Sequence, residues 1–357
     1  MKRVALLGAT GSIGRQAVDV VAAHPELELC ALQSRTTPLD DLAAEHGVEH
    51  VQVGGDPVAL LERSEPDIVL NAVVGFAGVP ATIWALERGV TLALANKESL
   101  VAAGDLAVAA RERGGGLLLP VDSEHSALHQ CLEGRDRATV SGLVLTASGG
   151  PFRGRARAEL AGVTAAEALA HPTWSMGPKI TVDSATLANK GLELIEAHWL
   201  FGVSYAMIEV VVHPSSVVHS LVRCRDGALL AHVGLPDMRV PISYALTYPE
   251  RAATPVEQLD LEGLTLEFEA VDHDAFPLLG LAREAGERGG TAPCAYNAAN
   301  EVAVAAFLEG RLGFLDIAAV VEETLSRVEG APARDLDDLD AADSEARRLA
   351  AGSLQPA

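Results

Sequence analysis

The sequence predicts an α/β protein with three parts: a Rossmann-like, doubly wound N-terminal domain, an α+β middle domain and a small C-terminal helical domain. Short Val- and Leu-rich runs alternate with Ala-rich helical stretches over residues 4–119, further strand-like runs follow between about 140 and 235, and helical spacing dominates beyond 276. At 357 residues the chain also exceeds the length that one hydrophobic core usually supports.

The first domain is expected to span residues 1–122. Its strand-like runs are VALLG, ELCAL, DIVLNAVV, VTLALA and GLLLP, each separated from the next by a helical stretch. This alternation is typical of βαβ units on a parallel sheet.

The middle domain is expected over residues 123–247, where the strand-like runs are SGLVLTASGG, IEVVVHPSSVVHSLVRC and ALLAHVGL. Arg225-Asp226-Gly227 separates the last two runs and predicts a hairpin turn. Residues 248–272 show little periodicity and are interpreted as a connecting segment.

The C-terminal domain is expected over residues 273–357, with helices at 276–288, 293–309, 315–328 and 341–351. The acidic stretch ARDLDDLD, at 333–340, is interpreted as a solvated loop between the last two helices.

Charge and cysteine content exclude several classes of partner and environment. The net charge of −22 argues against nucleic acid or an anionic membrane as partner, while an anionic small molecule remains compatible with local donors or a bound cation. The four cysteines have no metal-site or disulfide-framework spacing, and no apolar run resembles a leader or a membrane span. We expect a cytoplasmic protein with free thiols.

A glycine-rich motif, Gly8-Ala9-Thr10-Gly11-Ser12-Ile13-Gly14, lies between the first strand and the first helix. In that position it can turn tightly and present backbone amides to a pyrophosphate at a helix N-terminus. The alternative is a turn whose glycines serve only close packing of helix on strand.

The choice of nucleotide is made at the end of the second strand, where NAD-binding proteins carry an acidic residue. Here the strand ends Gln33-Ser34-Arg35-Thr36-Thr37, without a carboxylate. This favours NADPH, with Ser34 and Arg35 as candidate ligands of its 2′-phosphate; a solvated surface position is the alternative for Arg35.

A candidate metal site begins at Asp122 and Glu124, two residues apart after a strand of the parallel sheet. In extended backbone this spacing directs both carboxylates to the same side, where Mg²⁺ or Mn²⁺ would find oxygen ligands. A solvated loop is the alternative, although ligand sites in such sheets lie beyond the carboxyl ends of strands.

A second polar group follows a helix start predicted at Asp183 or Ser184. Asn189 and Glu193 are then four apart on one helical face, with Lys190 beside them. Ser148-Gly149-Gly150 would add an anion-binding nest, so that a phosphate pocket could form from neutral donors and one cation. A helix surface with a local ion pair and an ordinary turn are the alternatives.

Eight motifs, in order along the chain, together resemble the 1-deoxy-D-xylulose 5-phosphate reductoisomerase family over about residues 3–320. They are Gly8–Gly14, Asn96-Lys97-Glu98-Ser99-Leu100, Val121-Asp122-Ser123-Glu124-His125, Ser148-Gly149-Gly150-Pro151-Phe152, His171-Pro172-Thr173-Trp174-Ser175-Met176-Gly177, Val182-Asp183-Ser184-Ala185-Thr186, Asn189-Lys190-Gly191-Leu192-Glu193 and Pro236-Asp237-Met238-Arg239. Any one of these motifs is weak evidence, whereas the ordered set is specific.

The resemblance implies an NADPH- and metal-dependent oxidoreductase that converts 1-deoxy-D-xylulose 5-phosphate into 2-C-methyl-D-erythritol 4-phosphate, on the non-mevalonate route to isoprenoids. It implies a catalytic middle domain with Asp122, Glu124 and Glu193 as metal ligands; Ser148, Ser184, Asn189 and Lys190 at the substrate phosphate; Lys97, Ser123 and His171 at the reacting end or closing over it; and Gly8, Thr10, Gly11, Ser12, Ile13, Asn96, Glu98 and Gly177 at NADPH.

The family likeness also identifies residues 171–179 as a flap over the substrate, with Trp174 and Met176 excluding water. Two departures are visible: Pro178 stands where a basic residue is usual, and residues 33–37 lack the usual Gly-rich basic motif. After about residue 330 the likeness fades. The family implies a homodimer, for which the apolar strands around 208–235 are a candidate interface.

Two other functions remain open at this level. One is an NADPH enzyme of the same architecture with a different substrate, such as a semialdehyde or homoserine dehydrogenase or a divergent reductoisomerase-like oxidoreductase. The other is a nucleotide-sensing or scaffold protein that keeps the fold without the activity.

Overall fold

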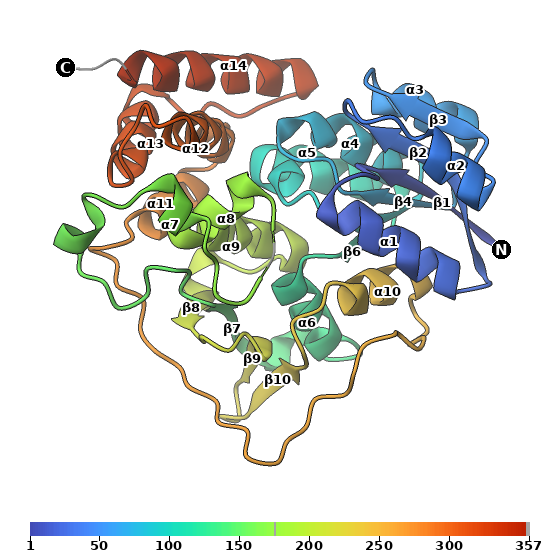
Figure 1. The fold of residues 1–357 in the computed structure, drawn as a ribbon, viewed down its shortest axis with the longest axis horizontal. Helices are drawn as coiled ribbons and strands as arrows, with labels where there is room; N and C mark the ends of the chain where they lie inside the picture. The colour runs from blue at the N-terminus through green and yellow to red at the C-terminus, as the bar shows by residue number, and fades with distance from the viewer. Residues whose placement is uncertain (175, 355–357) are drawn as a thin grey trace. The chain divides into compact units, whose positions relative to one another are not determined.

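The computed structural model describes residues 1–174 and 176–354, and within it the chain forms two compact units (Figure 1). The first unit consists of Met1–Ser99, Leu106–Gln130 and Asp237–Gln258. The second consists of Leu100–Asp105, Cys131–Pro236 and the chain from Leu259 onward.

A parallel six-stranded sheet with the order β3-β2-β1-β4-β5-β6 forms the centre of the first unit. Its strands are β1 (Lys2–Leu7), β2 (Leu27–Ser34), β3 (His50–Val53), β4 (Ile68–Asn71), β5 (Thr91–Leu94) and β6 (Leu118–Pro120). The order reverses beside β1, which pairs with both β2 and β4. Ligands of doubly wound sheets bind at the carboxyl ends of the strands at such a reversal.

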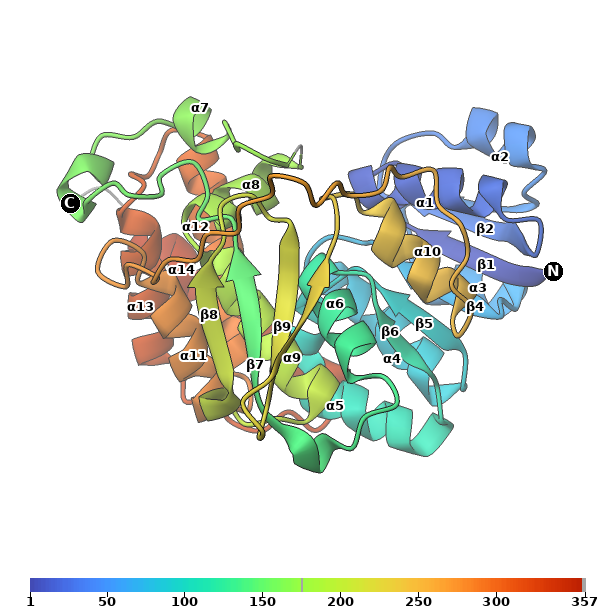
Figure 2. The ribbon, with the colours of Figure 1, turned by 90° about the horizontal axis from the view of Figure 1, so that it is seen from below.

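Helices cover both faces of this sheet (Figure 2). They are α1 (Ser12–Ala23), α2 (Asp40–His46), α3 (Pro57–Ser64), η1 (Phe76–Gly78), α4 (Val79–Glu87) and α10 (Arg239–Thr247), with parts of α5 (Glu98–Gly114) and α6 (Ser123–Leu132). On one face Val21 of α1 and Leu246 of α10 join the core formed with Leu6 and Leu32 of the sheet. The chain therefore returns to the first sheet after residue 236.

The second unit contains a four-stranded sheet with the order β10-β9-β7-β8. Its strands are β7 (Val140–Ala147), β8 (Ile208–Val212), β9 (Val218–Cys224) and β10 (Leu229–Val233). Strand β7 runs parallel to β8 and antiparallel to β9. The predicted hairpin between β9 and β10 is confirmed: Gly227 has a φ of +91°, and the Asp226 carboxylate accepts the Ala228 amide at 3.0 Å.

Helices make up the rest of the second unit. They are η2 (Arg137–Thr139), η3 (Arg157–Leu160), α7 (Ala165–Ala168), α8 (Pro178–Ala185), α9 (Ala188–Phe201), η4 (Tyr205–Met207), α11 (Leu278–Arg288), α12 (Ala292–Leu308), α13 (Asp316–Arg327) and α14 (Leu336–Ser353). Figure 1 shows α12, α13 and α14 packed together. The predicted fold class, with a Rossmann-like sheet, a second sheet and a C-terminal helical region, is confirmed.

The prediction of a solvated loop at 333–340 is wrong, because α14 begins at Leu336. Asp335 caps it by accepting the Asp338 amide at 2.9 Å, and Asp337 and Asp338 lie in its first turn. Carboxylates are favourable at this end, where the backbone amides of a helix are unpaired and its dipole is positive. The acidic run is thus a helix start.

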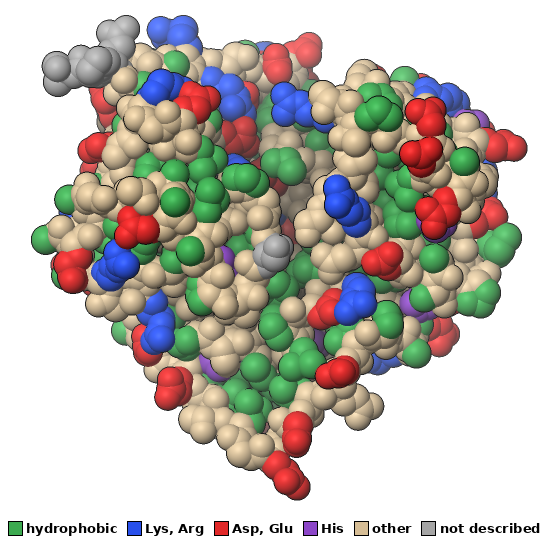
Figure 3. All heavy atoms as spheres, viewed as in Figure 1, with side chains coloured by type: hydrophobic (Ala, Val, Ile, Leu, Met, Phe, Trp, Pro, Cys, Tyr) green, Lys and Arg blue, Asp and Glu red, His purple; other side chains and the backbone are tan. Residues whose placement is uncertain are grey.

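A search of the described helices finds none that combines the length and the apolar character needed to span a bilayer. On the face drawn in Figure 3, the described Lys and Arg side chains lie among acidic ones and form no continuous basic surface.

Candidate active site

The glycine-rich loop connects β1 to α1 at the reversal of the strand order. Gly8 follows β1 with a φ of +81°, and the amides of Gly8 and Ala9 donate to the Gln33 carbonyl at 3.0 and 2.9 Å. Gly11 is the N-cap of α1, with no side-chain cap. The first amides of α1 therefore lack a side-chain acceptor from the cap and are suited to an anion.

The space around each glycine shows where close packing alone requires a residue without a side chain. A Cβ on Gly8 would lie 2.4 Å from the Ala72 carbonyl oxygen, and one on Gly14 would lie 2.3 Å from the Gly8 carbonyl oxygen. A Cβ on Gly11 would meet nothing closer than 3.4 Å. Packing therefore requires glycine at 8 and 14 but not at 11, where space remains beside the amides of the turn.

The two candidate ligands of a 2′-phosphate differ in their surroundings. Ser34 is fully buried at the end of β2, and its hydroxyl donates to the Thr37 carbonyl at 2.5 Å. Arg35 is exposed immediately beyond the strand. Of the two, Arg35 is the side chain that can turn toward a phosphate without breaking an internal hydrogen bond.

Asn96 and Glu98 hold the loop that follows β4. The Asn96 amide donates to the carbonyl oxygens of Val73 and Gly75 at 2.6 and 2.9 Å, and the Gly75 amide donates to Glu98 at 3.3 Å. Both side chains are almost completely buried. Any contact they make with a nucleotide would thus be combined with a structural role in this loop.

Lys97 and Asp122 form a buried ion pair, with Nζ and Oδ2 2.6 Å apart and side-chain exposures of 8% and 9%. The other carboxylate oxygen of Asp122 accepts the amides of Glu124 and His125 and lies 2.7 Å from His125 Nδ1. Asp122 thus caps α6, and Ser123 donates to the Glu124 carboxylate.

This geometry corrects the expectation of extended backbone from Asp122 to Glu124. Glu124 lies in the first turn of α6, because the Asp122 carboxylate satisfies the unpaired amides there and so favours a helix. The pairing of His125 with Asp122 was not predicted; the signal was a histidine three residues after a capping aspartate.

In the second unit, the hydroxyl groups of Ser148 and Ser184 meet at His171. The imidazole Nε2 lies 3.1 Å from the hydroxyl oxygens of both Ser148 and Ser184. On the other side of the ring, Nδ1 accepts the amides of Thr173 and Trp174 at 3.1 and 2.9 Å. Two amide donors require Nδ1 to be unprotonated, so the proton of the neutral ring is on Nε2 and faces the two serines.

Burial lowers the pKa of His171 below its ordinary value, which also favours the neutral ring. Ser148 in addition accepts the Gly150 amide at 3.2 Å, and Gly149 and Gly150 both have positive φ. The three residues present hydroxyl and amide donors with no carboxylate among them, as an anion site requires.

Helix α9 carries the second predicted group. Glu193, 1% exposed, accepts hydrogen bonds from the Asn189 amide and from the Lys190 ammonium. The predicted common face of Asn189 and Glu193 is confirmed. The predicted helix start at Asp183 or Ser184 is wrong: both lie in the last turn of α8, and α9 begins at Ala188 after Leu187, whose φ is +60°.

The segment predicted as a flap leads into α8. Gly177 is the N-cap of α8 and Pro178 its first residue, where a fixed φ and a missing amide cost nothing. Trp174 and Met176 are partly exposed, and Ser175 lies outside the described residues. Pro178, which departs from the family pattern, thus serves as a helix start.

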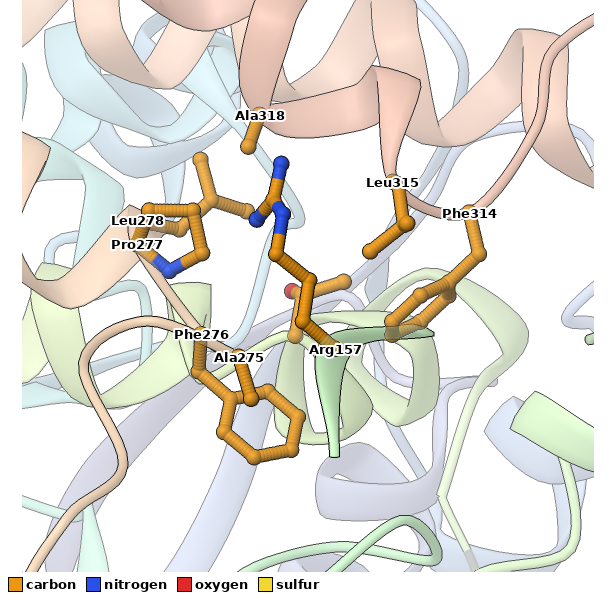
Figure 4. Close-up of a pocket in the computed structure, with 9 residues that line it drawn as sticks. Arg157, Ala275, Phe276, Pro277, Leu278, Phe314, Leu315 and Ala318 are labelled. Atoms are coloured by element: carbon orange, nitrogen blue, oxygen red, sulfur yellow. The ribbon is translucent and has the colours of Figure 1, made fainter. Parts of the chain in front are cut away.

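A mainly apolar pocket in the second unit contains none of the predicted site residues (Figure 4). Its lining is Arg157, Thr186, Ala275, Phe276, Pro277, Leu278, Phe314, Leu315 and Ala318. Arg157 also donates to the Asp274 carbonyl at 3.1 Å. The chemistry-bearing groups therefore lie elsewhere, in the polar clusters described above.

Comparison with known proteins identifies the family. The model of 1-deoxy-D-xylulose 5-phosphate reductoisomerase matches residues 4–57 and 33–104, and the models of its C-terminal domains match 118–201 and 233–349. The 1-deoxy-D-xylulose 5-phosphate reductoisomerase of Xanthomonas axonopodis pv. citri (strain 306) is 48% identical over 99% of this chain and 97% of its own. The chain belongs to the 1-deoxy-D-xylulose 5-phosphate reductoisomerase family.

Solved structures of the family agree. The reductoisomerase of Zymomonas mobilis in complex with NADPH superposes with a TM-score of 0.91 at 42% identity and covers all of both chains. A DOX-P reductoisomerase in complex with NADPH, fosmidomycin and magnesium gives 0.90 at 38% identity, covering 99% of this chain and 98% of that one.

Family membership changes two sequence interpretations. The likeness does not end near residue 320, since the family's C-terminal model reaches residue 349. Membership also removes the alternative of a semialdehyde or homoserine dehydrogenase, because the full-length likeness is to reductoisomerases.

Proposed function

We propose that this chain converts 1-deoxy-D-xylulose 5-phosphate into 2-C-methyl-D-erythritol 4-phosphate with NADPH and a divalent cation. The observation that carries the proposal is the 48% identity to a reductoisomerase over 99% of the chain. The polar groups of the two units supply the residue types that this reaction needs.

Residues of the first unit fit NADPH. Gly11 leaves room beside the amides of the β1–α1 turn, as a pyrophosphate needs. We assign NADPH contacts to Gly8, Thr10, Gly11, Ser12 and Ile13 of this turn. Ser34, Arg35, Asn96 and Glu98 complete the proposed cofactor site of this unit, and the family likeness adds Gly177. Its preference for NADPH over NADH is supported by the absence of a carboxylate at the end of β2.

The donor set fits a hard cation. We propose that Asp122, Glu124 and Glu193 hold Mg²⁺ or Mn²⁺, since all three offer carboxylate oxygens. Asp122 and Glu193 are each paired with a lysine ammonium, Lys97 or Lys190. When bound, such an ion polarises the substrate carbonyl and stabilises developing negative charge on oxygen.

The second unit fits the phosphorylated end of the substrate. We assign the phosphate to Ser148, Ser184, Asn189 and Lys190, which supply hydroxyl, amide and ammonium donors. His171, with its proton on Nε2, orients both serines and contacts the substrate. Lys97 and Ser123 bind its reacting end, and Trp174 of the flap excludes water.

We further propose a cytoplasmic homodimer that binds neither nucleic acid nor membrane. The dimer proposal is supported by the outermost strand β10, where the apolar side chains of Leu229 and Val233 are 50% and 41% exposed. An exposed apolar edge strand favours pairing with another chain. Light scattering on the purified protein tests it: a molar mass of one chain would exclude the dimer.

Product identification tests the reaction. The protein is incubated with 1-deoxy-D-xylulose 5-phosphate, NADPH and Mg²⁺, and the product is identified by mass spectrometry and NMR. We expect 2-C-methyl-D-erythritol 4-phosphate, with no turnover when a semialdehyde replaces the sugar phosphate. An unchanged sugar phosphate from folded, NADPH-binding protein would contradict the proposal.

A further inference from the structure

Helix α8 connects two parts of the proposed substrate site. It begins at Pro178, within the predicted flap segment 171–179, and carries Ser184 in its last turn. Its end also packs closely on the Ser148 loop, because a Cβ on Gly150 would lie 2.8 Å from the Ser184 carbonyl oxygen. A rotation of α8 would therefore displace both serines that face His171.

A buried carboxylate connects this helix to α12. Asp183, 1% exposed, precedes Ser184 and lies 2.6 Å from the ammonium of Lys179, one turn earlier in α8. Its other oxygen accepts the side-chain amide of Asn300, on α12, at 2.8 Å. An isolated buried carboxylate is costly, so both donors are needed where Asp183 lies.

The Asn300 contact is the side-chain link from α12 to this carboxylate. Asn300 is completely buried, as is Asn297 one turn earlier on the same helix. The amide of Asn297 donates instead to Glu301, at 2.9 Å, within α12. Two buried asparagines on one helix thus differ in whether they hold α8.

We propose that Asn300 and Asp183 are positioning residues for substrate phosphate binding: their hydrogen bond fixes the rotation of α8 and thereby the hydroxyls of Ser184 and Ser148. Neither side chain touches the substrate. The proposal rests on the phosphate site proposed above and adds the residues that hold it from the C-terminal helices.

The test compares Asn300→Ala with the matched control Asn297→Ala in steady-state kinetics of the full-length protein. Both variants lose one buried amide, so similar losses of thermal stability are expected. Asn300→Ala should raise the KM for 1-deoxy-D-xylulose 5-phosphate about tenfold and leave the KM for NADPH unchanged. Asn297→Ala should leave both constants within about twofold of the wild type.

A double variant tests geometry directly. Asp183→Asn combined with Asn300→Asp keeps one amide facing one carboxylate. Its substrate KM should therefore lie close to that of the wild type. If Asn300→Ala does not fold, Lys179→Met removes the other donor from a side chain that is already 22% exposed, and a raised substrate KM is again expected.

The positioning role would be overturned by equal kinetic effects of Asn300→Ala and Asn297→Ala. It would also be overturned if the substrate KM were unchanged in both Asn300→Ala and Lys179→Met. Failure of the proposed function is a different result, because wild-type protein would then not turn over the sugar phosphate at all.

Discussion

Gly14 and Gly11 of the glycine-rich motif should respond differently to substitution by alanine. Gly14→Ala places a methyl group 2.3 Å from the Gly8 carbonyl oxygen and 2.6 Å from that of Ala9. Both are backbone atoms of a tight turn and must move by about 1 Å, which costs on the order of 1–3 kcal/mol. At about 2–4 °C per kcal/mol, the melting temperature should fall by about 2–12 °C.

Gly11→Ala meets nothing closer than 3.4 Å, at a φ of −73° that alanine adopts freely. A weaker N-cap and a less flexible unfolded chain oppose each other, so stability should change by less than about 1 kcal/mol. The methyl group would instead obstruct the approach of a pyrophosphate, and NADPH affinity should fall at least tenfold, or about 1.4 kcal/mol.

Thermal unfolding and fluorescence titration with NADPH measure the two effects. Wild-type NADPH affinity in Gly11→Ala would refute the cofactor role of this turn. A wild-type melting temperature in Gly14→Ala would show that the close contacts described for this glycine are wrong.

Four further predictions concern titratable groups and the substrate site. Glu193→Gln should reduce turnover at least a hundredfold and leave the NADPH affinity measured by titration unchanged, because the proposed cation acts on the substrate. Lys190→Ala should chiefly raise the substrate KM, and an unaltered KM would exclude that lysine from the phosphate site. The pKa of His171 lies below its unfolded value, so the folded state binds fewer protons and stability is lost as the pH falls through about 6.5. Denaturant titrations from pH 8 to 5 should show a smaller loss of unfolding free energy in His171→Gln than in the wild type. Burial raises the pKa of Cys30 to about 11 and of Cys294 to about 12, so neither should react with a thiol reagent at pH 8 before unfolding, as peptide mapping can check.

Local patterns predicted the fold class because each carries its own physical cause. The alternation of strand-like and helical runs correctly predicted the Rossmann-like sheet, and Arg225-Asp226-Gly227 correctly predicted the hairpin. The return of the chain at residue 237, which places α10 on α1, has no such local signal. Contacts between segments more than 200 residues apart depend on complementary surfaces that periodicity does not reveal.

Two errors of the sequence interpretation arise from helix capping. Asp335 and Asp122 were expected in a loop and in extended chain, yet each accepts amides at a helix start. A capping side chain has the same composition as a loop residue, and only the helix that follows distinguishes them.

Within the candidate site, spacing predicted the grouping of Asn189, Lys190 and Glu193, because four residues make one helical turn. The contact of His171 with Ser148 and Ser184 joins segments that are far apart in sequence, and it entered the prediction only through family likeness. The hydrogen bond from Asn300 to Asp183 has no signal in the sequence, since it depends on how α12 packs on α8.

The central claim is tested most directly by following NADPH oxidation at saturating 1-deoxy-D-xylulose 5-phosphate, first with Mg²⁺ or Mn²⁺ and then with excess chelator. We expect oxidation that requires both the sugar phosphate and the cation, and that returns when the cation is restored. Oxidation that continues unchanged in the chelator, or none at all from folded protein that binds NADPH, would contradict it.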